Sequence, residues 1–154
     1  LSVFLWYLSR GDVEHPEVYE VKSEVYEDYV SAVKGLNAKS YVMLLTSGSE
    51  RVVRRLREVV GETVVSDTMY KLEELGSALK EALTSNPEDL RRLLRSKGLK
   101  HDAITSALKA VEEGKMGRAL RILLSSILED WRIEDAPLII ANLVDDVRMV
   151  AKGL

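Results

Sequence analysis

The feature that most constrains the fold is the spacing of apolar residues, which is helical from Met69 to the end of the sequence. Asn86 precedes Pro87, a residue that suits the first turn of a helix. Gly114 suits a helix end. The second half is therefore predicted to be all-helical, with helices over about 70–83, 87–96, 102–113, 116–131 and 136–152.

The first half contains short runs of β-branched and aromatic residues between helical segments. These runs predict strands at Ser2–Leu8, Ala38–Thr46 and Thr63–Ser66, with a short edge strand at Val18–Val21. Helices are predicted over about 24–36 and over 50–60, where Gly61 ends the second helix. This alternation implies right-handed crossovers and an α/β half built on a small three-stranded, mainly parallel sheet.

The length of 154 residues suits one domain better than two. We expect a single domain over residues 1–154, predominantly helical overall, with an α/β subdomain at 1–69 and a helical subdomain at 70–154. Because three strands make a small sheet, the helical half is expected to cover one of its faces.

The composition excludes several kinds of site. Cysteine is absent, which removes disulfides, thiolate zinc sites and thiol nucleophiles, and the two histidines are too few for a histidine-built metal site. We therefore expect no metal and no cofactor. No apolar run approaches the roughly 20 residues that cross a bilayer, so a cytoplasmic protein is expected. The absence of glutamine and the many charged residues are typical of a hyperthermophile protein.

One loop is a candidate ligand site. Thr46, Ser47, Gly48 and Ser49 join a predicted strand to a predicted helix, which would place their amides and hydroxyls at the carboxyl edge of the sheet. Arg10 and Asp67 follow the other two strands and would lie at the same edge. This pattern favours a nucleotide- or anion-binding crevice. The alternative is that Ser49 only caps the next helix, and no glycine-rich phosphate-binding motif is present.

Basic residues form the second candidate feature. Such side chains can bind nucleic-acid phosphates or an acidic protein surface, although helices commonly carry solvated basic faces. Residues 12–28 hold seven acids against one lysine, so charge is segregated along the chain, and we favour a protein partner. The candidate partner- or nucleic-acid-binding residues are Arg51, Arg54, Arg55, Arg91, Arg92, Arg95, Lys97, Lys100 and Arg118.

No catalytic set can be nominated from the sequence. Adjacent acids at 129–130, 134–135 and 145–146 do not share a helix face, which favours structural roles over a magnesium site. Arg95 and His101 have the loose spacing found in helical ribonuclease domains, but Gly98 lies between them and is expected to break the helix. An enzyme is therefore the least favoured class of protein.

The helical half resembles the lid of clamp-loader-type AAA+ proteins. Residues 110–120 (AVEEGKMGRAL) and the Ile122–Leu124 run look like a lid helix ending in Glu-Gly-Asp-Met followed by an Arg-Ala-Leu helix. A short connection, here 131–137, then leads to a final helix. The resemblance covers about 38–141 and includes strand–helix–strand elements like the sensor-one region. Gly117 stands where the family has a nucleotide-sensing arginine, and Walker A and Walker B motifs are missing.

These features lead to three hypotheses of different classes. The first is a non-catalytic adaptor that binds protein partners in a nucleic-acid-processing assembly such as replication or repair, with homo-oligomers as one form of association. The lid resemblance implies a relative that binds other subunits and does not hydrolyse ATP. The second is a small-ligand-sensing α/β domain that uses the Thr46–Ser49 loop, and the third is an enzyme with a site that the sequence does not reveal.

Overall fold

The computed structural model describes residues 36–47 and 49–154. These residues form α-helices, one short 3-10 helix and no β-strand. The elements are α3 (Ala38–Leu45), α4 (Glu50–Val60), α5 (Glu62–Ser85), α6 (Pro87–Ser96), α7 (His101–Glu112), α8 (Met116–Ile127), η1 (Ile133–Asp135) and α9 (Ala136–Ala151).

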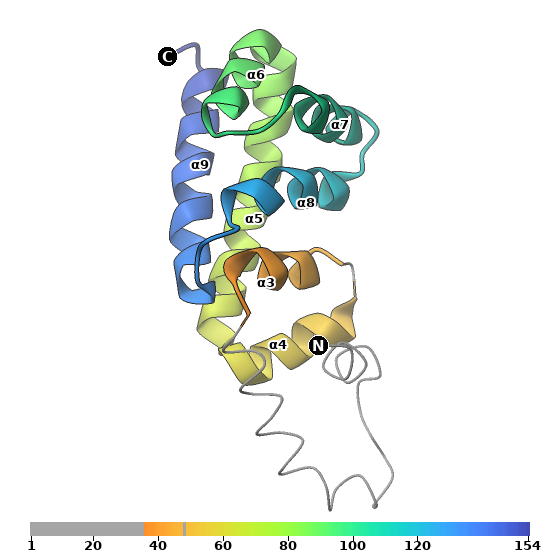
Figure 1. The fold of residues 1–154 in the computed structure, drawn as a ribbon, viewed down its shortest axis with the longest axis vertical. Coiled ribbons are helices and arrows are strands. Elements are labelled where there is room, and N and C mark those ends of the chain that lie inside the picture. Colours follow the sequence, from red (N-terminus) through yellow and green to blue (C-terminus); the bar gives the residue numbers. More distant parts are fainter. Residues whose placement is uncertain (1–35, 48) are drawn as a thin grey trace, which may run out of the picture.

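Two long helices, α5 and α9, lie side by side along the length of the molecule (Figure 1). They run in the same direction, because the C-terminal end of α5 is bonded to the C-terminal end of α9: Ser85 Oγ donates to the carbonyl oxygen of Ala151. The helices α7, α8 and α3 lie across this pair, one above the other, with α4 at the opposite end of the molecule from α6 (Figure 1).

The core lies between the two long helices and the helices that cross them. Leu75 and Leu79 of α5 are fully buried in the same cluster as Ile140 and Val147 of α9. The last helix is thus a central core element, although Leu138 on its outer face is 66% exposed. The predicted subdomain boundary at residues 69 and 70 falls inside α5, and the core includes residues on both sides of it.

The prediction of a strand at Ala38–Thr46 is wrong, because this segment forms the helix α3. Its buried residues are Ala38, Tyr41, Val42 and Leu45, a spacing that places them on one face of a helix. Asn37 caps the helix, since its side-chain oxygen accepts from the amide of Ser40 at 2.9 Å. Leucine and methionine are good helix formers, so local preference and burial agree here.

The strand predicted at Thr63–Ser66 is also wrong, since these residues form the first turns of α5. Val65 and Thr68 are buried and begin a stripe that continues through Leu72 and Leu75. Burial of this continuous stripe outweighs the moderate preference of β-branched residues for strands. The predicted three-stranded sheet is therefore absent from the part of the chain that the structure describes.

Most helix predictions in the described residues are confirmed. The helix at 50–60 has the predicted bounds, and Ser49 caps it by accepting from the amide of Val52. Pro87 lies in the first turn of α6, and α7, α8 and α9 begin within one residue of their predicted starts. The strand at 2–8, the edge strand at 18–21 and the helix over 24–36 are predictions outside the described residues, apart from Leu36.

None of the helices at 38–151 combines the length and the apolar character needed to cross a bilayer. Localisation in the cytoplasm stays a prediction.

Candidate partner-binding surfaces

The loop singled out in the sequence connects two helices and is not at the edge of a sheet. Thr46 and Ser47 follow α3, and Ser49 precedes α4. Gly48 and Arg10 lie outside the described residues, and Asp67 is exposed on α5. The sheet edge that was expected to bring Arg10, Asp67 and this loop together is therefore missing from the described structure.

The hydroxyl groups of this loop are used by the local backbone. Thr46 Oγ1 donates to the carbonyl oxygen of Val42 at 2.8 Å, and Ser47 Oγ donates to that of Leu44 at 2.7 Å. Ser49 Oγ accepts from the amide of Val52, which is the capping role weighed as the alternative to ligand binding. These contacts end one helix and begin the next, so they do not favour an anion site.

A groove lies beside this loop, between α3, α5 and α8. One hollow of about 450 Å³ has a mainly apolar lining. A second hollow of about 420 Å³ shares Leu45 and Met69 with the first and extends towards α4. We call the first hollow the α3–α5–α8 groove; its lining residues are Leu45, Thr46, Met69, Leu72, Glu73, Gly76, Ser77, Lys80, Met116 and Leu120.

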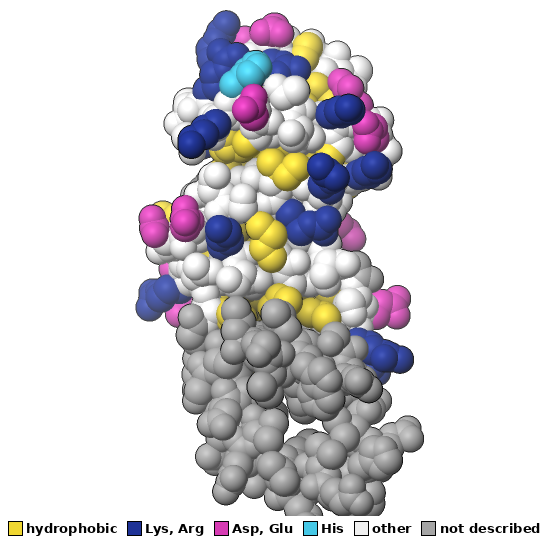
Figure 2. Space-filling view, turned by 45° about the vertical axis from the view of Figure 1, so that its right-hand side comes forward, with side chains coloured by type: hydrophobic (Ala, Val, Ile, Leu, Met, Phe, Trp, Pro, Cys, Tyr) yellow, Lys and Arg dark blue, Asp and Glu magenta, His cyan; other side chains and the backbone are white. Residues whose placement is uncertain are grey.

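Two charged side chains of α5 line one side of this groove. Glu73 and Lys80 are exposed on α5, seven residues apart, and neither forms an ion pair with any other described residue. The apolar part includes the flexible side chains of Met69 and Met116, which adapt to partners of different shape. On the face shown in Figure 2, apolar side chains likewise lie between charged ones.

Sequence reasoning missed this groove because its wall depends on the helical conformation of residues 62–69. Met69, Gly76 and Lys80 share one face of a helix, at spacings of seven and four residues. With a strand assigned to Thr63–Ser66 and a helix starting only at Tyr70, Met69 was not placed on that face. The helical spacing of Val65, Leu72 and Leu79 is the signal that would have found it.

The arginines of α4 do not form one exposed surface. Arg51 and Arg54 are exposed, whereas Arg55 is buried and pairs with Glu58 at 3.2 Å. Arg57 pairs with Glu62 at the start of α5, at 3.4 Å. Only Arg51 and Arg54 of this group are thus open to a partner through exposed side chains.

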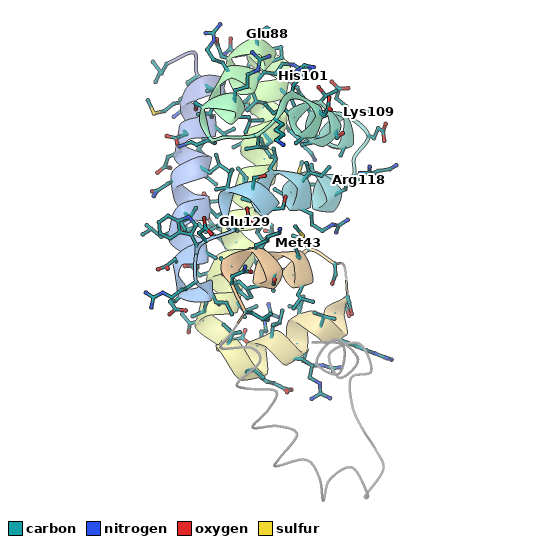
Figure 3. All side chains as sticks on the ribbon, viewed as in Figure 1. Met43, Glu88, His101, Lys109, Arg118 and Glu129 are labelled. Atoms are coloured by element: carbon teal, nitrogen blue, oxygen red, sulfur yellow. The ribbon has the colours of Figure 1, made fainter. Side chains whose placement is uncertain are left out.

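The second basic group surrounds the junction of α6 and α7, at the other end of the molecule from α4 (Figure 1). Dark blue side chains gather there around the cyan His101 in Figure 2. Arg92 pairs with Asp89, and Lys97 pairs with Asp146 of α9 at 2.8 Å. Arg118 belongs to α8, and Figure 3 shows it at a different level of the molecule from His101. The arginines of α4, the basic residues at the α6–α7 junction and Arg118 of α8 therefore do not form one continuous surface.

Some acidic side chains in the described part of the chain form ion pairs between or within helices. Glu134 and Asp135 both pair with Arg132, and Asp146 pairs with Lys97. No group of three or more carboxylate or histidine side chains that could hold a metal ion is found among residues 36–47 and 49–154. Three acids of the doublets, Glu134, Asp135 and Asp146, thus form ion pairs, and the structural role of the doublets stays a prediction.

The segments that carry the lid resemblance form α7, α8 and the connection to α9. Gly117 packs closely on α3: a Cβ atom there would lie 3.3 Å from the carbonyl oxygen of Thr46. An arginine at this position would therefore require a small local shift between α8 and the end of α3. The segments compared with the sensor-one strands are helical, so that part of the expected fold is wrong.

Comparison with protein-family models, curated protein sequences and solved structures found no match to this chain. The lid resemblance consequently stays a prediction.

Proposed function

We propose that the chain is a non-catalytic adaptor that binds a helix of a protein partner in a nucleic-acid-processing assembly. The observation that carries this proposal is the α3–α5–α8 groove with its apolar lining and two opposite charges on its rim. The lid resemblance adds the type of assembly, because its implied role is the binding of other subunits.

The dimensions of the groove favour an amphipathic helix as the occupant. Its α5 wall extends from Met69 to Lys80, eleven residues or roughly 16 Å at the rise of an α-helix. A partner helix of about three turns has that length and presents apolar side chains at every third or fourth position. Burial of such side chains against the leucine and methionine lining supplies the main favourable free energy of binding.

The rim charges define the polar face of that partner. Glu73 and Lys80 are two helical turns apart, about 10 Å along α5. A complementary helix carries a basic residue opposite Glu73 and an acidic residue opposite Lys80. Such pairs at an exposed rim add orientation and specificity more than affinity.

Site-specific cross-linking tests the proposal. A photoreactive amino acid replaces Ser77, which lines the groove and is exposed, and in a separate variant Ser106, an exposed serine of α7. Both variants are incubated in lysate of the source cells and irradiated. We expect one protein to be cross-linked in stoichiometric amount at Ser77 and not at Ser106, through a peptide with amphipathic helical spacing.

A blocking variant completes the test. Ser77→Arg places a long side chain in the groove without changing a buried residue. It should therefore lower the affinity for the recovered protein at least tenfold. A cross-link to a second copy of this chain would replace the adaptor function by self-association. Equal cross-linking at Ser77 and Ser106, or undiminished binding by Ser77→Arg, would overturn the proposal.

A further inference from the structure

The junction between α6 and α7 has a fixed geometry. Gly98 has φ of +92°, and its amide donates to the carbonyl oxygen of Arg95, which ends α6. Leu99 is buried in the core, and its amide donates to the carbonyl oxygen of Leu94 at 3.3 Å. Because this turn is anchored by a buried leucine and by backbone hydrogen bonds, the backbones of the end of α6 and the start of α7 are held in a defined arrangement.

The cations near the junction of α6 and α7 fall into two groups, those with an ion-pair partner and those without one. Arg92 and Lys97 have ion-pair partners, in Asp89 and in Asp146 of α9. Arg91, Arg95 and Lys100 form no ion pair with any residue of 36–47 or 49–154. We call these last three residues, with the exposed His101, the α6–α7 corner. The nearby acids are Glu88 and Asp89 in the first turn of α6, where Asp89 pairs with Arg92, and Asp102 in the first turn of α7.

The start of α7 adds hydrogen-bond donors to the corner. Lys100 is the N-cap residue, and no side chain caps the helix. The first backbone bond of this helix joins the amide of Ile104 to the carbonyl oxygen of Lys100, so the preceding amides of the first turn have no helical partner. These donors and the positive end of the helix dipole favour an anion at the start of α7, beside Lys100.

Spacing and side-chain type favour phosphates over carboxylates as that anion. Arg91 and Arg95 are four residues apart, so their side chains lie on one face of α6, about 6 Å apart at Cβ. This separation is comparable to that of consecutive phosphates along a nucleic-acid strand. Arginine binds phosphate oxygens through two parallel N–H donors. The three unpaired cations can thus follow a phosphate backbone.

We propose that the α6–α7 corner binds the phosphate backbone of nucleic acid without reading its sequence. This inference deepens the proposed adaptor function by naming a second partner, and it rests on the corner and not on the groove. Neutralisation of about three phosphates predicts a slope near −3 for the logarithm of the binding constant against that of the salt concentration. Affinity for duplex DNA is then expected to fall roughly 40-fold between about 50 and 200 mM salt.

Fluorescence anisotropy with a labelled duplex DNA of random sequence tests this site. Arg91→Ala with Arg95→Ala should weaken binding at least tenfold at low salt and reduce the salt slope by about two. The matched control is Arg51→Ala with Arg54→Ala, which removes the same charge from exposed residues of α4 at the other end of the molecule. That control should change the affinity less than threefold and the slope little.

Three results would overturn the inference. These are the absence of DNA binding at low salt, an equal loss in the α4 control, and tighter binding of a labelled poly-glutamate peptide than of DNA, which would identify an acidic protein as the partner. The Ser77→Arg variant separates this site from the groove, because it should bind DNA like the wild type. Loss of its protein partner with retention of DNA would leave both proposals intact.

Discussion

Arg121 of α8 donates from Nη1 to the backbone carbonyl oxygen of Thr46, at 2.6 Å. Thr46 is the residue that ends α3, where the carbonyl groups of the last turn have no helical partner. The guanidinium group therefore stabilises the negative end of α3 and ties it to α8. Gly117 lies against the same carbonyl oxygen: a Cβ atom there would be 3.3 Å away, so a larger residue would require a small shift of α8 or of Thr46.

We expect Arg121→Leu to lower the free energy of unfolding by about 2 kcal/mol, because a charge-assisted hydrogen bond is lost. Chemical denaturation measures this change. Arg118→Leu is the matched control: Arg118 is exposed one turn away and forms no ion pair with another described residue, so its loss should cost less than about 0.5 kcal/mol. Equal effects of the two substitutions would show that the bond to Thr46 contributes nothing.

The hydroxyl of Tyr41 is buried and donates to Thr68 Oγ1 at 2.9 Å, while Thr68 donates to the carbonyl oxygen of Val64. Burial raises the pKa of Tyr41 from 10.0 to about 12, and the Asp67 carboxylate adds to the rise. The unfolded chain thus loses this proton first as pH rises, so the stabilising contribution is complete below pH 10 and is lost as pH rises through about 12.

Tyr41→Phe should therefore cost about 1 kcal/mol at pH 8, where a buried hydrogen bond is lost. Between pH 8 and pH 11 the difference in unfolding free energy should change by about 1 kcal/mol in favour of the variant, so that the two proteins become about equally stable. The reason is that phenylalanine has no proton to lose on unfolding. Urea unfolding at the two pH values checks both numbers. Tyr70→Phe, at a tyrosine that is 60% exposed, is the matched control.

The helical half could be predicted because its boundaries are marked locally. Pro87 and Gly114 identify helix ends that the structure confirms within a residue or two. The apolar stripe of α9 likewise follows from its sequence, but only the structure shows that Ile140 and Val147 pack against α5 and not in an interface.

The sheet could not be rejected from the sequence because short apolar runs suit either a buried strand or a buried helix. Val64 and Val65 favour a strand locally, yet they lie in a helix whose buried stripe continues to Ala82. The groove also depends on the helical conformation of this segment, because Met69 lines it from α5. Likewise, the pairing of Lys97 with Asp146 joins residues 49 positions apart, and no local pattern predicts which cations of α6 are left unpaired.

Asn86 offers a direct test of local against tertiary roles. Its position before Pro87 suggests a helix cap, but its side chain forms no capping bond, and Nδ2 instead donates to the carbonyl oxygen of Val150 at 2.9 Å. Asn86→Asp should therefore lower the free energy of unfolding by about 1–2 kcal/mol, because the donor is lost and a carboxylate faces a carbonyl oxygen.

For a capping residue the same substitution would be neutral or stabilising, since aspartate is an equally good N-cap. Asn142→Asp on the exposed face of α9 is the control, and we expect a change within about 0.5 kcal/mol there. Thermal and urea unfolding of the two variants distinguish the roles. A stabilised Asn86→Asp variant would mean that the bond to Val150 is dispensable.

Gly76 lies in the interior of α5, where alanine is roughly 1 kcal/mol more favourable than glycine. A Cβ atom there would lie 3.1 Å from Cγ and 3.3 Å from Sδ of Met116, so the methionine must move. Met116 is partly buried and lines the α3–α5–α8 groove, which gives its flexible side chain space to rotate. Gly76→Ala should therefore stabilise the fold by up to about 0.5 kcal/mol and narrow the groove.

A double-mutant cycle with Met116→Ala isolates this contact. In the Met116→Ala background no methionine has to move, so Gly76→Ala should there gain its full helix preference of roughly 1 kcal/mol. Urea unfolding gives the four free energies, and cross-linking at Ser77 reports on the groove in the same variants. If Gly76→Ala destabilises the protein by more than about 1 kcal/mol in both backgrounds, the crowding comes from other atoms than Met116, and the groove does not have the free space that partner binding requires.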